Sequence, residues 1–189
     1  MKFLDALLGR SRPVRSHLER LMSISTAALA FAASNGLQSK GSAGICFRSL
    51  SSSQFSSLQR ELSELLAVSG KETGTDTLIK EDSFGYHWVV LEDPDFEDLV
   101  TTIHMVSLTL SEHGFRDQLL AAAFHFEDMT GTGMYWIYNY KRGSFYPFAP
   151  NGSRTRDNAL ELRMQAVADR ELPLEADQSK WYALWELPV

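Results

Sequence analysis

Cysteine is nearly absent from this chain of 189 residues, in which Cys46 is the only one. An internal disulfide and a thiol metal cluster within one chain are therefore excluded, and a reducing cytoplasm is the expected compartment. Long apolar runs are lacking too. No stretch approaches the ~18 apolar residues of a membrane-spanning helix, and the short apolar segment at residues 3–8 is not followed by a cleavable signal pattern.

The chain also lacks an overall positive charge. Its formal net charge is -6 at pH 7, which argues against specific or general nucleic-acid binding by the whole surface. Two segments differ from this average, because residues 1–20 and residues 141–163 each carry five basic against two acidic side chains. We expect these basic segments to contact an acidic partner or an anionic surface.

Motifs for catalysis or metal binding are missing as well. No two of the histidines stand at i, i+4 on an expected helix, and none belongs to an HExxH motif. Cys46 lies in a short apolar strand, where an inert buried thiol is the default expectation and no base partner is evident. The sequence therefore predicts no catalytic residue, no metal and no cofactor.

Hydrophobic residues make up 44% of the chain and charged residues 22%, as in an ordinary globular protein. We expect one cooperative unit, in which an N-terminal helical segment (residues 1–40) packs on an α+β domain (residues 41–189). We expect the first apolar segment, within residues 1–15, to pack on the domain or on a partner helix. Weak peripheral contact with a membrane surface is the alternative.

Periodicity and turn residues place the individual elements. Helices are expected at residues 3–8, 14–22, 26–33, 53–68, 94–113 and 158–169. Strands are expected at residues 45–48, 77–80, 86–91, 119–126 and 134–140. A strand over residues 28–32 is the alternative for the third helix, residues 69–76 are expected to form a loop, and Pro94 is expected in the first turn of its helix.

The resulting order contains β-α-β-β-α-β, which is typical of a ferredoxin-like fold. We predict a single antiparallel sheet with helices mainly on one face, one added strand and a C-terminal helix. A secretion-chaperone-like α+β fold is the alternative. Residues 172–174 and 181–185 are expected to fold back over the domain as a covering segment.

The stretch from Met134 to Leu162 carries the densest pattern. Its strand has aromatic residues on both faces, which indicates a position inside a sheet. Residues 145–150 contain two prolines, so we expect an ordered connection and not a strand, with Phe145, Tyr146 and Phe148 mostly in the core. Asp157 or Asn158 is expected to cap the following helix.

Basic and aromatic side chains mix along this stretch, which makes it the expected contact surface for a partner or a ligand. Such mixing also occurs in platforms for single-stranded nucleic acid, but the acidic chain favours packing and protein contact. The candidate contact residues are Tyr140, Lys141, Arg142, Tyr146, Arg154 and Arg156.

Several segments together resemble the phage-shock-associated family called PspAB. The matching segments are FLDALLGRSRPV at 3–14, GICFR at 44–48, DSFGYHWVV at 82–90, YKRGSFYPFAP at 140–150, RDNALEL at 156–162 and LPLEADQSKWYALW at 172–185. They are spaced over nearly the whole chain and follow the order of the family.

The resemblance implies a small cytoplasmic accessory protein of a phage-shock or envelope-stress system, of a kind found beside a PspA protein in actinobacteria and archaea. It implies no established catalytic residue. The first hypothesis is therefore a non-enzymatic adaptor that contacts a PspA-like coiled coil or another phage-shock component. The alternative is a small-ligand-binding protein or an enzyme with a pocket near Tyr140, Arg142 and Tyr146.

Overall fold

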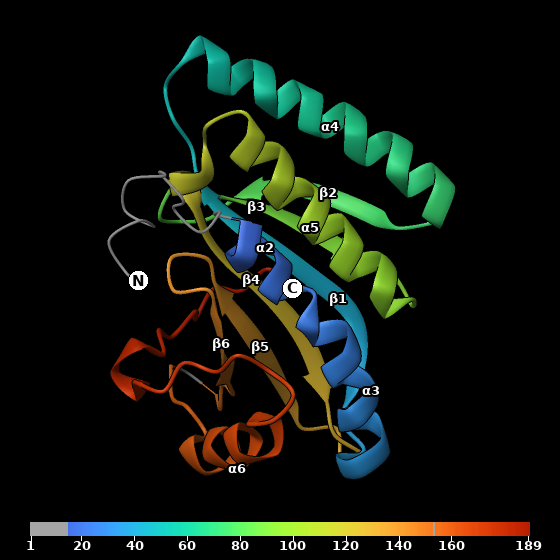
Figure 1. Ribbon diagram of the computed structural model, residues 1–189, viewed down its shortest axis with the longest axis vertical. Coiled ribbons are helices and arrows are strands. Elements are labelled where there is room, and N and C mark those ends of the chain that lie inside the picture. The colour runs from blue at the N-terminus through green and yellow to red at the C-terminus, as the bar shows by residue number, and fades with distance from the viewer. Residues whose placement is uncertain (1–14, 153) are drawn as a thin grey trace, which may run out of the picture.

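The computed structural model describes residues 15–152 and 154–189 (Figure 1). Its helices are α2 (Arg15–Leu21), α3 (Ser23–Asn35), α4 (Ser53–Thr73), α5 (Phe96–Glu112) and α6 (Asn158–Ala168), with 3-10 turns at Arg116–Gln118 and Gln178–Lys180. Its strands are β1 (Gln38–Arg48), β2 (Asp76–Glu81), β3 (Tyr86–Glu92), β4 (Leu119–Glu127), β5 (Gly133–Asn139) and β6 (Ser144–Phe148). The helix expected at residues 3–8, with the membrane contact proposed for it, lies outside the described residues.

The six strands form one antiparallel sheet in the order β2-β3-β1-β4-β5-β6. Strand β1 lies between β3 and β4, and β2 pairs with β3 at the edge of the sheet. The elements from β1 to β4 therefore have the split β-α-β arrangement that the sequence predicts. Strands β5 and β6 extend the sheet beyond β4, so that the fold carries two added strands where one was expected.

Strand β6 corrects the expectation of an irregular connection over residues 145–150. The backbone N–H of Phe145 donates to Pro173 O, and Phe145 O accepts from Glu175 N, so Phe145 turns its backbone groups away from β5. Pro147 shares that orientation two residues later, and it pairs with Trp136 of β5. Its missing N–H therefore removes no hydrogen bond from the β5–β6 ladder, which is why an edge strand tolerates the proline.

Side chains alternate between two apolar layers, one on each face of the sheet. The helices cover one face, where buried residues of α2 to α6 join the larger core (Figure 1). The opposite face carries a smaller cluster around Trp88, Ile137 and Tyr146, which residues 181–189 cover. The predictions of helices on one face and of a C-terminal covering segment are both confirmed.

Local signals account for most element ends. The side chains of Ser52, Asp95 and Asp157 accept hydrogen bonds from backbone N–H groups in the first turns of α4, α5 and α6. Pro94 precedes this cap, so its expected place in the first turn was wrong. Helix α3 spans residues 23–35, which excludes the alternative strand, and α4 continues to Thr73 through more than half of the expected loop at 69–76.

Candidate functional site

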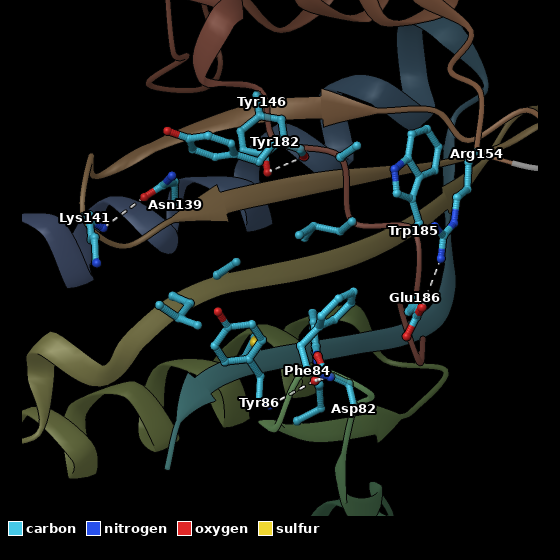
Figure 2. Close-up of a pocket in the computed structure, with 16 residues that line it drawn as sticks. Asp82, Phe84, Tyr86, Asn139, Lys141, Tyr146, Arg154, Tyr182, Trp185 and Glu186 are labelled. Carbon is cyan, nitrogen blue, oxygen red and sulfur yellow. Dashed lines mark hydrogen bonds and ion pairs between the residues drawn. The ribbon is translucent and has the colours of Figure 1, made fainter. Parts of the chain in front are cut away.

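A groove crosses the face of the sheet opposite the helices, between the strands and the C-terminal segment (Figure 2). Its volume is about 560 Å³ and its lining is mostly apolar. We call it the aromatic groove after the side chains of Phe84, Tyr86, Trp88, Tyr146, Tyr182 and Trp185. Its size lies within the ~300–1,000 Å³ of ordinary ligand pockets.

The turn between β2 and β3 forms one wall. The Asp82 carboxylate accepts hydrogen bonds from the backbone N–H groups of Phe84 and Tyr86, both at 2.9 Å, and from Trp88 Nε1 at 3.1 Å. Gly85 has a φ of 80°, which a residue with a side chain adopts only with strain. This turn fixes Trp88 in the wall and leaves the Phe84 ring 69% exposed on the rim.

The C-terminal segment forms the opposite wall, and hydrogen bonds from the sheet hold it. Tyr146 Oη donates to Tyr182 O at 2.9 Å, and Tyr135 Oη donates to Val189 O at 3.0 Å. Glu186 accepts from Ser83 Oγ at 2.5 Å and lies 3.4 Å from Arg154 Nη2. The groove is thus closed on two sides by segments that lie about a hundred residues apart in the sequence.

Cys46 lies on the floor of the groove, where β1 passes beneath it. Burial, together with the charge of Asp82, raises the pKa of the Cys46 thiol to about 12. The thiolate is the nucleophilic form of cysteine, and it is scarce at neutral pH when the pKa is this high. The thiol therefore contributes to the apolar floor and not to nucleophilic chemistry.

Cys46 should consequently resist thiol reagents in the folded protein. At pH 8 a pKa of about 12 leaves ~1 thiolate in 10⁴, so labelling by DTNB should be at least ~10³-fold slower than in unfolded chain. The measurement compares absorbance traces in buffer and in guanidinium chloride, where the same thiol serves as its own control. Rapid labelling in buffer would contradict this account of the groove floor.

The six candidate contact residues do not form one surface. Lys141 lies at one end of the aromatic groove and Arg154 at the other, while Tyr146 lines the space between them (Figure 2). Tyr140 is buried in the core on the helix side of the sheet, so its place among the candidate contact residues was wrong. Three of the six therefore meet at the groove, including one of the three residues of the alternative pocket hypothesis.

Arg142 and Arg156 are engaged in ion pairs beside the groove. Arg142 donates to the buried carboxylate of Glu175 and holds the pKa of that carboxyl below its usual range. Arg156 Nε contacts both oxygens of the buried Glu161, at 2.9 and 3.1 Å. In the turn at residues 141–143, Arg142 therefore has an ion-pair partner. Lys141 has none among the described residues.

Sequence reasoning missed the residues that form most of the groove, notably Phe84, Trp88 and Trp185. The sequence did contain one signal for the groove. Tyr86, Trp88 and Val90 alternate along β3, which gives this strand apolar residues on its second face as well. That pattern indicates that something covers this face, but it does not say that the covering segment leaves a gap. The small side chain of Ala121 in β4 contributes to that gap.

Among residues 15–152 and 154–189, no group of three or more His, Cys, Asp or Glu side chains could hold a metal ion. No helix there is long and apolar enough to cross a membrane.

The model of one protein family, described as PspA associated protein B, matches residues 1–189. The chain belongs to the PspAB family. No curated protein and no solved structure matches it. The resemblance inferred from the sequence segments is thereby confirmed, and the name of the family suggests an association with PspA. The aromatic groove of this PspAB-family chain, at about 560 Å³, is larger than the cavity of about 400 Å³ beside Gly36 and Pro94.

Proposed function

We propose that this PspAB-family chain is a non-enzymatic adaptor of a phage-shock system, acting in the cytoplasm and binding a PspA-like coiled-coil protein through the aromatic groove. The family match supports the partner, because the family is described by its association with PspA. The observation that carries the choice of surface is the exposed aromatic rim above an apolar floor. Buried and unpaired Cys46 fits a reducing compartment.

The rim has the chemistry of a protein-binding hot spot. Phe84, Tyr182 and Trp185 are exposed although their rings are large and apolar. Aromatic side chains dominate the binding energy of protein interfaces because their burial removes much apolar area from water. An apolar helix face laid along the groove would cover these rings.

Charge at the ends of the groove suits a helix with acidic flanks. Lys141 is exposed, and it has no ion-pair partner in the described part of the chain. Coiled-coil helices carry charged residues beside their apolar positions, so an acidic residue there would meet this ammonium group. Attraction of this kind affects the rate of association and depends on salt.

Titration with the cognate PspA tests the proposal. Phe84→Ala should weaken binding at least ~10-fold, as loss of a hot-spot ring does, while the melting temperature stays near that of the wild type. Met129→Ala is the matched control, because Met129 is 89% exposed but lies on the β4–β5 turn, away from the groove. Lys141→Glu should weaken binding more at low salt than at high salt, with Lys71→Glu on α4 as its control.

The possible outcomes test the identity of the partner and the choice of binding surface separately. If the wild-type chain fails to bind PspA at tens of micromolar, the adaptor proposal is wrong. If it binds and both groove variants bind as tightly as their controls, PspA uses another surface.

The volume of the groove favours a second candidate function, the binding of a small apolar ligand. Arg142 and Tyr140 take no part in its lining, so the ligand would contact Tyr146, Tyr182 and Trp88 instead. A thermal-shift screen against metabolites distinguishes the two functions. A compound that stabilises the wild type but not Tyr182→Ala would favour the ligand-binding function.

A further inference from the structure

The two edges of the sheet differ in how they end. Residues 173–175 cover the outer edge of β6, where the backbone of Phe145 hydrogen-bonds to Pro173 and Glu175. Strand β2 forms the other edge, and all six of its residues are exposed. Leu78 is 56% and Ile79 38% exposed. An uncovered edge with apolar side chains is a template for pairing with another strand.

The ladder between β2 and β3 determines which backbone groups face outward. Asp82 N donates to Tyr86 O at the end of the hairpin, so residue 82 turns its backbone groups toward β3. Orientation alternates along an antiparallel strand, so the backbone groups of Lys80, Leu78 and Asp76 also face β3. Those of Glu81, Ile79 and Thr77 face the open edge.

We propose that β2 pairs antiparallel with β2 of a second copy of this chain, about a twofold axis at Leu78. An isologous interface of this kind requires a surface that is complementary to itself. The sequence of β2, Asp-Thr-Leu-Ile-Lys-Glu, meets this requirement in one register.

Hydrogen bonding restricts the registers to those that pair Thr77, Ile79 and Glu81 among themselves. Centring the pair on Leu78 places Asp76 opposite Lys80 of the second copy, and Lys80 opposite its Asp76. In a register centred on residue 77 or 79, neither Asp76 nor Lys80 lies opposite a residue of the opposite charge. In a register centred on residue 76 or 80, that residue lies opposite its own copy, so like charges face each other. The Leu78 register therefore has the best charge complementarity.

Within the part of the chain that the structure describes, one charge on this strand is left uncompensated. Asp76 lies directly opposite Glu92 of β3, and like charges in that position destabilise a sheet. Among the described residues, no ion pair neutralises Asp76. The ammonium group of Lys80 from a second copy would lie on its other side and offset the repulsion.

The helices leave room for this contact. The side chains of Thr77, Ile79 and Glu81 lie on the helix side of β2, and all three remain exposed. Helix α4 lies above this face of β2 but leaves a gap, because Ile79 and Glu81 line a cavity of about 340 Å³ together with Leu62 of α4. Pairing would continue the sheet across both copies, with the helices of both on one face and both aromatic grooves on the other.

Sedimentation equilibrium of the full chain over a range of concentrations tests the inference. The average mass of the wild type should rise from one chain toward two. Lys80→Asp alone and Asp76→Lys alone should each remain a single chain, because each faces like charges with itself. An equimolar mixture of these two variants should regain the mass of two chains, because both acidic positions of the first variant then face lysines of the second.

A backbone variant tests the pairing independently of charge. Ile79→Pro removes an N–H that points away from β3, so it should abolish the two-chain species while leaving the fold, measured by circular dichroism, intact. Ile79→Val is the matched control and should retain it. A wild type that stays a single chain at all concentrations, or a mixture of charge variants that does not associate, would overturn the inference. Binding of PspA through the groove does not depend on either result.

Discussion

Replacing Arg156 with alanine is expected to lower the free energy of unfolding by about 3–5 kcal/mol, because it leaves a buried carboxylate without its partner. Glu161 is only 2% exposed, and it accepts from Arg156 Nε and from the backbone N–H of Ala149. Arg156 also donates to Trp181 O at 2.6 Å and lies 5.1 Å from the centre of the Phe148 ring. It thus joins α6, β6 and the C-terminal segment. Denaturation by urea measures the effect.

Arg154 provides the matched control two residues away. Its pair with Glu186 is exposed, and exposed ion pairs contribute only about 0–1 kcal/mol. Arg154→Ala should therefore leave the urea midpoint nearly unchanged. The double variant Arg156→Met with Glu161→Leu should recover part of the loss, since it removes the unpaired charge and keeps apolar volume. Equal midpoints for Arg154→Ala and Arg156→Ala would refute the structural role of Arg156.

Replacing Phe148 with alanine is the other change with a large expected effect, a loss of about 3–5 kcal/mol from a total stability of about 5–15 kcal/mol. The Phe148 ring is fully buried on the groove side of the sheet. It packs at 5.4 Å between ring centres against Trp185, so its removal would leave a cavity beneath the C-terminal segment. The melting temperature should fall sharply.

Phe145→Ala and Tyr146→Ala test the same packing on both sides of the sheet. Phe145 lies in the helix-side core and Tyr146 on the groove side, so all three truncations should be destabilising. Phe84→Ala is the control for loss of an exposed ring, and it should melt close to the wild type. Three near-native melting temperatures for the buried positions would contradict the packing and would transfer these rings to the binding surface.

More of the fold than of the candidate site could be predicted from the sequence. Period-two alternation from Met134 to Asn139 placed β5 inside a sheet, and the structure puts it between β4 and β6. The same alternation correctly assigned Tyr140 to one face and Asn139 to the other. It did not reveal that the face of Tyr140 belongs to the helix-side core, so a buried tyrosine entered the list of candidate contacts.

By itself, the sequence determined the features that depend on near neighbours. These are the helical periodicity of α4 and α5, a cap at Asp157 or Asn158 and the order of elements that specifies a split β-α-β sheet. Tertiary structure decided the rest. Pro147 is compatible with a strand only because its nitrogen faces away from β5, and the groove exists only because residues 181–186 cross a face whose strands come from elsewhere in the chain. Both depend on which segments become neighbours in space, and that is fixed by the packing of the whole chain.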